Sequence, residues 1–376
     1  MGDKQHSNLP PSSAKMWIAC NPSAKRNAEL PSTTSPYAAE GTEAHALCEY
    51  KLLKALGREA DDPRSTLQFL DQEMEDCSDE YVSFVMQNVT PTSIVMVEQR
   101  LDFSAYAPGG YGTGDCVIVT DGNLHIIDFK YGKGIPVSVG SDEKGVNPQL
   151  ACYALGALSA FDGIYDIDTV SMSIMQPRLN IADTYTISKE DLEAWGRNTL
   201  APAAERASRG EGEYVAGDHC QFCKVKATCR KRAEYNLQMA RYDFAKPDDL
   251  EDTEIEAILA KVDELISWAN DIKDFALAEA IAGKAWTDFK LVEGRSTRKY
   301  TSESDVAKAV RAAGFDPYEK KVLGITAMTK LLGKEKFNDL LGSFIEKPAG
   351  KPTLVPMSDK RPALKNTAKE DFKEEQ

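Results

Sequence analysis

The alternation of apolar and polar residues predicts three consecutive strands in the first half of the chain. The stretches Ile94–Phe103, Gly112–Val119 and Leu124–Lys130 have the strand pattern and are rich in β-branched residues. Asp121-Gly122-Asn123 separates the last two and is typical of a tight hairpin turn. A fourth strand is expected near residues 169–176.

Helical spacing of apolar residues predicts several helices around these strands. Pro and Ser residues open a short helix that ends near Cys20. A helix over residues 38–56 carries His45 and Glu49 on one face, because they are four residues apart. Another helix is expected over residues 148–160.

The last third of the chain predicts a long helix and then smaller elements. Thr253 and Glu256 have the spacing of a capping box, and the apolar stripe that follows suggests core packing, with a coiled-coil contact to a partner as the alternative. Residues 286–300 suggest a short strand pair containing Arg295, Arg298 and Lys299, followed by two helices. The pattern as a whole predicts an α/β fold with a smaller, mainly α-helical C-terminal region.

Composition excludes a membrane protein and a protein that coats nucleic acid. Of the 376 residues, 42% are hydrophobic and 28% charged, and no apolar stretch approaches the roughly 20 residues that span a bilayer. We therefore expect a cytoplasmic protein without a membrane partner. The net charge is −14, but residues 284–376 contain 19 Lys and Arg against 14 Asp and Glu, so this region is the expected DNA contact.

The candidate chemistry lies where the predicted strands end. Gly112-Thr113-Gly114-Asp115 is followed by Asp128-Phe129-Lys130, and then by Gln149 with Tyr153 four residues later. Two acids on neighbouring strands can share a divalent cation, and carboxylate oxygens suit Mg²⁺ or Mn²⁺. Asp128 and Lys130 point to the same face of a strand, which brings an ammonium group to the cation site.

A cation beside a lysine is the arrangement that phosphodiester hydrolysis requires. The metal activates a bound water, and the lysine orients that water or stabilises developing negative charge. Each motif alone has a simpler explanation: Asp-x-Lys is common on exposed strands, and two glycines such as Gly112 and Gly114 are typical of a turn. The ordered set is more specific than its parts.

Three of the eight cysteines suggest a second metal centre. Cys220, Cys223 and Cys229 lie close together in sequence. Thiolates at this spacing suit a soft metal. Zn²⁺ remains an alternative, with His219 replacing one cysteine, and so does the absence of any ligand.

The ordered Gly-x-x-Asp, Asp-x-Lys and Gln-x-x-x-Tyr motifs resemble the RecB-like branch of the PD-(D/E)XK nuclease superfamily, which includes AddB and CRISPR-associated exonucleases. The resemblance implies a mixed central sheet flanked by helices and a metal site formed by His45, Asp115 and Asp128. Asp115, Asp128 and Lys130 would be the catalytic residues. Glu98, Gln149 and Tyr153 would surround this site.

The resemblance also implies a four-iron, four-sulfur cluster held by Cys20, Cys220, Cys223 and Cys229. The whole chain is similar to an uncharacterised RecB-like family of phage and prophage genomes, through Trp17–Cys20, Leu291–Ser296 and Gly324–Met328.

Four regions are expected. Residues 1–235 would form a RecB-like nuclease domain with an iron–sulfur staple, and 236–283 a long connecting helix. Residues 284–346 would form a small basic domain, and 347–376 a disordered tail.

The expected function is metal-dependent hydrolysis of DNA, as an exonuclease in phage DNA replication, recombination or processing. The substrate would be single-stranded DNA or DNA with a free end. The expected protein partner is a phage single-strand-binding protein, helicase or polymerase. Any helicase would be a separate chain, since this sequence contains no phosphate-binding loop. The alternative is a non-catalytic nucleic-acid-binding or scaffold protein of a phage replication complex.

Overall fold

The first half of the chain forms the three strands that its apolar pattern predicts. In a computed structural model, β1 (Ile94–Asp102), β2 (Tyr111–Thr120) and β3 (Gly122–Phe129) follow one another as antiparallel neighbours. The turn between β2 and β3 is tight because Gly122 adopts a φ of 85°, which residues with a Cβ rarely tolerate.

Two later strands complete the sheet. β6 (Ile167–Gln176) lies parallel to β3, and β7 (Ile181–Ser188) lies antiparallel to β6, which gives the order β1-β2-β3-β6-β7. The crossover between the parallel strands contains a small hairpin of β4 (Gly140–Ser141) and β5 (Gly145–Val146), and then helix α5 (Pro148–Phe161). The fold is therefore α/β with a mixed sheet, as expected; β7 was not among the predicted strands.

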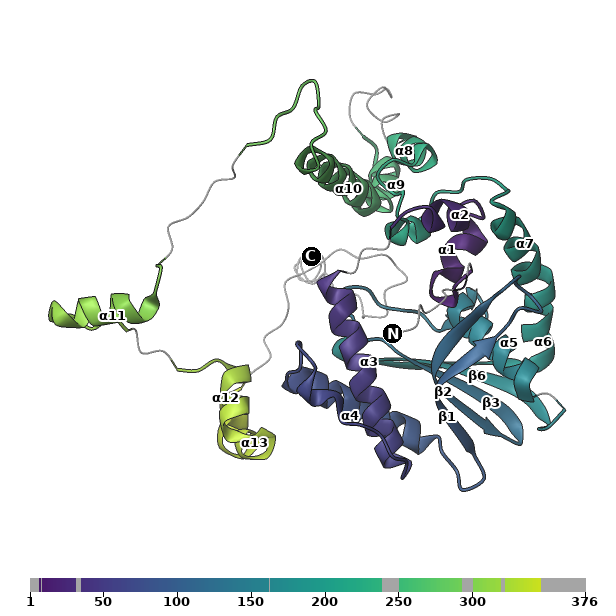
Figure 1. Ribbon diagram of the computed structural model, residues 1–376, viewed down its shortest axis with the longest axis horizontal. Coiled ribbons are helices and arrows are strands. Elements are labelled where there is room, and N and C mark those ends of the chain that lie inside the picture. Colours follow the sequence, from purple (N-terminus) through teal and green to yellow (C-terminus); the bar gives the residue numbers. More distant parts are fainter. Residues whose placement is uncertain are drawn as a thin grey trace, which may run out of the picture. The chain divides into compact units, whose positions relative to one another are not determined.

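Helices cover both faces of this sheet (Figure 1). Helices α3 (Pro36–Ala55) and α4 (Gln72–Gln87) lie on one face, and α5 lies on the other with α6 (Lys189–Trp195) and α7 (Ala201–Arg209). Alternate strand residues enter the two cores. The α3/α4 side buries Val95, Cys116, Ile118, Ile127 and Phe129. The α5 side buries Leu101, Val117, Val119, Leu124 and Ile126.

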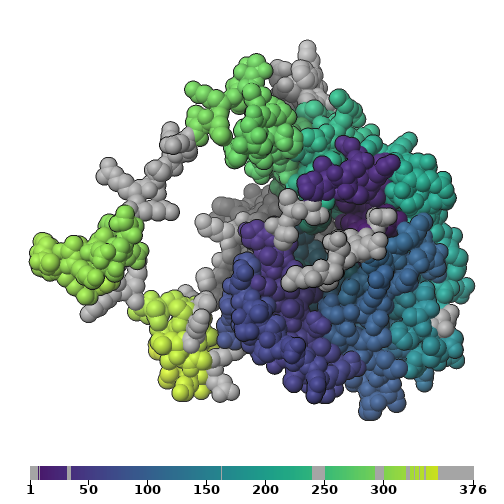
Figure 2. Space-filling model, viewed as in Figure 1, coloured from purple at the N-terminus to yellow at the C-terminus, as the bar shows by residue number. Residues whose placement is uncertain are grey.

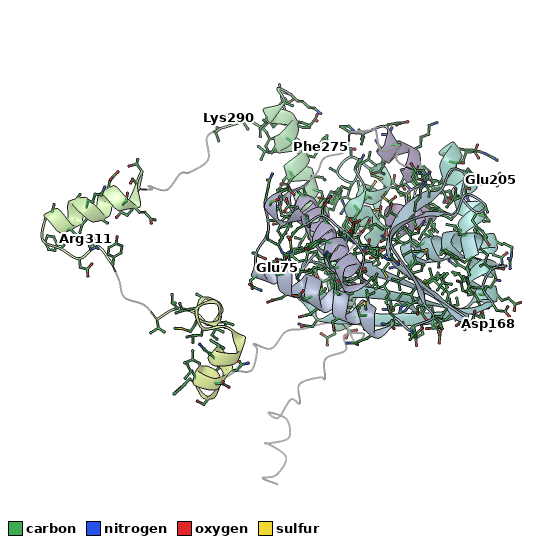
Figure 3. The ribbon with its side chains drawn as sticks, turned by 60° about the horizontal axis from the view of Figure 1, so that its bottom comes forward. Glu75, Asp168, Glu205, Phe275, Lys290 and Arg311 are labelled. Atoms are coloured by element: carbon green, nitrogen blue, oxygen red, sulfur yellow. The ribbon has the colours of Figure 1, made fainter. Side chains whose placement is uncertain are left out.

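An ion cluster around Glu75 fixes α4 against α3 (Figure 3). Lys51 of α3 places its Nζ 2.7 Å from Glu75 Oε2, and Arg64 Nε donates to Glu75 Oε1 at 2.7 Å. The hydrogen bonds from Arg64, and then those from Lys51, lower the pKa of Glu75 to about 2. Glu75 therefore stays ionised and keeps both cations paired.

The N-terminal helices pack against α7. Short helices α1 (Ala14–Ala19) and α2 (Ser23–Ala28) follow the turn Pro11–Ser13, and Figure 2 shows them in purple against later segments of the chain in teal. Trp17 is buried, and its Nε1 donates to the carbonyl of Pro10 at 3.1 Å. Arg206 of α7 donates to the Asn21 side chain at 2.9 Å, which joins the two segments.

The region after the cysteines contains α8 (Arg230–Leu237), α9 (Asp252–Leu259) and α10 (Val262–Ile281). The sequence predicts one long helix from Thr253, but α9 ends at Leu259 and α10 begins at Val262. The capping box also differs, because Glu251 and Glu254 form it. Nothing in the local sequence, which contains no proline or glycine, explains the break.

The chain divides into two compact units, residues 1–278 and 279–376. The structure describes residues 7, 9–31, 35–161, 163–238, 250–292, 300–318 and 322–345. The described part of the second unit contains three short helices where two were predicted: α11 (Glu303–Ala312), α12 (Ile325–Leu332) and α13 (Lys334–Leu341). Of the predicted strand pair, an isolated bridge joins Trp286 and Phe289.

Several predictions lie outside the described residues. They concern Arg295, Arg298 and Lys299, most of the 291–296 motif, and the tail from residue 347. Within the described ranges, every helix is too short or too polar to cross a membrane. The expected division into four regions stays a prediction.

Burial of His125 makes stability depend on pH. His125 of β3 is 7% exposed and lies 2.7 Å from the Ser173 hydroxyl, and burial lowers its pKa from 6.5 to about 4. The imidazole of His125 binds a proton more tightly in the unfolded chain than in the folded one. Its contribution to the free energy of unfolding is therefore fully present above the unfolded pKa and is lost as the pH falls toward 4. When the pH is lowered from about 7.5 to about 5, we expect protonation of His125 in the unfolded chain to reduce the free energy of unfolding by about 2 kcal/mol.

Urea unfolding at the two pH values measures this loss. In His125→Gln, whose amide can still bond to Ser173, the loss should be smaller by that amount. Equal losses in the two proteins would contradict the assignment.

Candidate functional site

Glu98 and Asp115 lie opposite each other where the β1–β2 ladder is interrupted. Val97 pairs with Cys116 before the break and Gln99 with Gly114 after it, so the register itself does not shift. Glu98 has a φ of 49°, a left-handed conformation that is uncommon for residues other than glycine and occurs mainly at functional sites.

The side chains of β2 change face at the same break. Val117 and Val119 pack on the α5 side after it, whereas before it a Cβ on Gly112 would lie 2.8 Å from the Tyr153 ring of α5. A Cβ on Gly114 would lie 2.9 Å from Leu101 on that side. Even-numbered residues of β2 thus face α5 before the break, and odd-numbered residues face it after the break. Asp115 lies between these two stretches, so its side chain does not follow the regular alternation.

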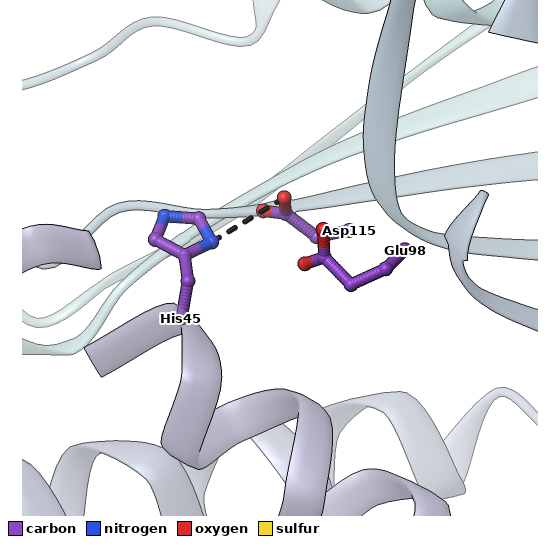
Figure 4. Close-up of side chains that lie close together, drawn as sticks. All are labelled: His45, Glu98 and Asp115. Atoms are coloured by element: carbon purple, nitrogen blue, oxygen red, sulfur yellow. Dashed lines mark ion pairs between the residues drawn. The ribbon is translucent and has the colours of Figure 1, made fainter. Parts of the chain in front are cut away.

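His45 of α3 completes a cluster with these two acids. Its Nδ1 lies 3.3 Å from Asp115 Oδ1, and one ligand atom from each of His45, Glu98 and Asp115 lies within 4.8 Å of the others. Figure 4 shows the imidazole on its helix facing both carboxylates. The sequence predicted His45 and Asp115 as metal ligands, but it placed Glu98 outside the direct ligands.

Asp128 and Lys130 lie next to this cluster, at the end of β3. Asp128 is 2% exposed, and its Oδ2 lies 2.8 Å from Lys130 Nζ. The backbone amide of Phe129, between them, donates to Asp115 Oδ2 at 2.7 Å. The structure therefore brings Asp115, Asp128 and Lys130 together, although Asp128 is not within the compact group that His45, Glu98 and Asp115 form.

Gln149 of α5 holds Asp128 and Lys130 in place. Its Nε2 donates to Asp128 Oδ1 and to the Tyr153 hydroxyl, both at 3.2 Å, and its Oε1 accepts from Lys130 Nζ at 3.1 Å. Gln149 and Tyr153 thus lie at the site, where the family resemblance places them. The close packing of Tyr153 on Gly112 also explains why the first motif needs glycine there.

Burial and the neighbouring charges together set protonation in this site. Burial raises the pKa of Asp128, the charge of Asp115 raises it further, and Lys130 opposes the rise. Burial also acts to raise the pKa of Asp115, but His45 and Lys130 outweigh it and hold the value below its ordinary range. For Lys130 and His45, burial lowers the pKa, yet the neighbouring carboxylates outweigh it, and both pKa values are raised.

These residues fit a divalent cation. Asp128 Oδ2 is buried and meets no donor in hydrogen-bond geometry, despite its proximity to Lys130. Carboxylate oxygens with one imidazole are ligands that Mg²⁺ and Mn²⁺ accept. A cation here would offset the repulsion between the acids.

All four predicted cysteine ligands line a second hollow, which also includes Lys226 and Arg232. Cys20, Cys220 and Cys223 are buried, and Cys229 is half-buried. Asn27 donates to Cys223 Sγ at 3.3 Å. Thiol groups around one cavity, with cations and an amide donor beside them, fit a negatively charged thiolate–metal centre.

His219, the alternative zinc ligand, also lines this hollow. Its Nε2 lies 2.9 Å from the carbonyl of Val215. The hydrogen bond to Cys20 is the largest influence on the pKa of His219, and it raises this pKa. Burial acts to lower the pKa, the bond to Val215 raises it, and the net shift is upward. A backbone carbonyl thus orients the His219 ring next to Cys20, an arrangement that also fits a zinc site in which His219 replaces one cysteine.

A family model described as "Protein of unknown function (DUF2800)" matches residues 6–362 of this chain. One solved structure, described as "Crystal structure of SSO0001", is similar at 14% sequence identity. That match covers 58% of this chain and 94% of the other, with a TM-score of 0.24. A TM-score this low supports no conclusion about fold or function.

Replacing Glu98 by glycine separates backbone strain from cation binding. A left-handed non-glycine residue costs about 1–2 kcal/mol, and glycine loses about 0.5–1 kcal/mol to entropy. We expect Glu98→Gly to leave the unfolding free energy of the metal-free protein unchanged or about 1 kcal/mol higher. Its Mn²⁺ affinity should fall about tenfold or more.

Titration with Mn²⁺, followed by electron paramagnetic resonance, measures the affinity. Asp102→Asn is the matched control, because Asp102 is an exposed acid on the same strand. Unchanged Mn²⁺ affinity in Glu98→Gly would show that Glu98 is not a ligand.

Proposed function

The chain belongs to the DUF2800 family, and from its site we propose that it is a metal-dependent nuclease that hydrolyses DNA. The proposal includes a PD-(D/E)XK core of the RecB type. The single observation that carries it is the convergence of His45, Glu98 and Asp115 within 4.8 Å, next to the buried Asp128–Lys130 pair. The resemblance in sequence further suggests a role in phage DNA replication, recombination or processing.

His45, Glu98 and Asp115 would hold Mg²⁺ or Mn²⁺, with Asp128 adjacent. Such a cation lowers the pKa of a bound water and neutralises charge on the phosphate. The chain supplies the geometry: the Phe129 amide orients Asp115, and Gln149 orients both Asp128 and Lys130.

Lys130 acts as an electrostatic stabiliser in this proposal. Although burial acts to lower its pKa, its carboxylate neighbours raise it, so Lys130 is an ammonium group before the cation binds. An ammonium group donates hydrogen bonds and accepts none. It therefore stabilises negative charge that develops on the phosphate oxygens.

Removing either member of the Asp128–Lys130 pair should strongly slow DNA hydrolysis. Lys130→Met should reduce the rate by about 10²–10³-fold, the usual effect of losing one charge-stabilising donor. Asp128→Asn should reduce it at least as much, because the carboxylate beside the cation is lost. The assay is degradation of end-labelled single- and double-stranded DNA with Mn²⁺, which also gives the polarity of digestion.

Asp168→Asn is the control, because Asp168 is an exposed acid at the start of β6 (labelled in Figure 3). It should cut DNA at the wild-type rate. If wild-type protein binds Mn²⁺ but cuts no DNA, the nuclease proposal is wrong, and a non-catalytic nucleic-acid-binding or scaffold role takes its place.

We also propose that Cys20, Cys220, Cys223 and Cys229 hold a four-iron, four-sulfur cluster. The support is that all four line one hollow, so no histidine is needed to complete the ligand set. Cys20 follows α1, whereas the other three lie between α7 and α8. The cluster would therefore join the N-terminal helices to the end of the sheet domain.

Anaerobically purified protein should contain iron and acid-labile sulfide and show broad visible absorption. Cys223→Ala should lose all three signals and unfold at lower urea concentration, because a ligand and a cross-link are lost. Cys152→Ala is the matched control, since Cys152 is a buried cysteine in α5 outside the hollow. Stoichiometric zinc without sulfide would instead identify a zinc site.

A further inference from the structure

Tyr81 of α4 has a buried hydroxyl without a partner in the cation site. The residue is 1% exposed, and its hydroxyl makes no hydrogen bond within the described part of the chain. It lines the same small hollow as His45, Glu98 and Asp115. A phenylalanine would fill the same space without burying a polar group.

An unsatisfied buried hydroxyl costs free energy, because folding removes its hydrogen bonds to water. Buried polar groups in folded proteins nearly always have partners, and an exception indicates a missing water, ion or function. The apolar body of Tyr81 is well placed for packing alone, since it contacts the Phe129 ring at 5.2 Å between centroids. Packing therefore explains the ring but not the hydroxyl.

Phe129 gives Tyr81 and His45 a shared support. The His45 ring meets Phe129 edge-on at 5.4 Å between centroids. The Phe129 backbone amide holds Asp115. One residue thus fixes the tyrosine, a predicted ligand imidazole and a predicted ligand carboxylate relative to one another.

The hydroxyl remains protonated throughout the ordinary pH range. Burial raises the pKa of Tyr81 far above its usual value, and the nearby Cys116 and Asp115 raise it further. A neutral phenol is a hydrogen-bond donor rather than a strong anionic ligand. Its partner should therefore be an oxygen that carries negative charge or lies next to a cation.

We propose that Tyr81 is a positioning residue that donates a hydrogen bond to an oxygen ligand of the cation held by His45, Glu98 and Asp115. The oxygen belongs to the carboxylate of Glu98 or Asp115, which line the hollow together with Tyr81 (Figure 4 shows both carboxylates beside His45). This inference rests on the proposed cation site, but it does not require that the protein cuts DNA. Hydrogen bonds to metal ligands fix their orientation and increase metal affinity.

Tyr81→Phe tests the proposal, because it removes only the hydroxyl. In the full chain without metal, the variant should be as stable as wild type or more stable, since an unsatisfied group is gone. Its Mn²⁺ affinity should nevertheless fall by about 10–100-fold. A residue with a purely structural role would not change stability and metal affinity in opposite directions.

Tyr131→Phe is the matched control, because Tyr131 is also buried and stacks on Phe129 but does not line the hollow. It should keep wild-type Mn²⁺ affinity. Unchanged affinity in Tyr81→Phe, or a less stable metal-free variant, would overturn the proposal, as would wild-type protein that binds no Mn²⁺. If wild type binds Mn²⁺ more tightly than Tyr81→Phe but cuts no DNA, the proposed activity fails and this inference stands.

Discussion

Three carboxylates close together in a largely buried site are the constraint on which the rest of the structure depends. Glu98, Asp115 and Asp128 come from three neighbouring strands, and His45 pairs with Asp115 while Lys130 pairs with Asp128. Ionised acids cannot stay together at low dielectric without compensation. The raised pKa of Asp128, caused by burial and by Asp115, expresses this conflict, and a divalent cation bound in the site would resolve it.

The sheet brings these groups together by local departures from regular geometry. A regular β1–β2 ladder would send alternate residues to opposite faces, but the break at Glu98 and Asp115 directs both carboxylates toward α3. Phe129 provides the complementary support, because its side chain packs under His45 while its amide holds Asp115. The strained backbone of Glu98 is thus a cost of assembling the site.

Much of the sheet and part of the site could be predicted from the sequence because they depend on local signals. The Asp121-Gly122 turn fixes the β2–β3 hairpin, and period two places Asp128 and Lys130 on one face. The place of Glu98 in the cluster with His45 and Asp115 was not predictable, because no residue preference signals a left-handed glutamate within a strand. Tyr81 was missed because its significance comes from an absent hydrogen bond, which depends on packing between distant segments.

The N-terminal segment links the cysteine hollow to the acidic site through direct contacts. Pro11 packs on Gly112 beside the Tyr153 ring, while Cys20 lies at the end of the helix that follows. Tyr153 accepts from Gln149, and Gln149 contacts both Asp128 and Lys130. A centre that binds Cys20 together with Cys220, Cys223 and Cys229 would hold Pro11 in place, and through Tyr153 it would limit the movement of Gln149. The cysteine centre therefore has a structural route to the acidic site without taking part in its chemistry.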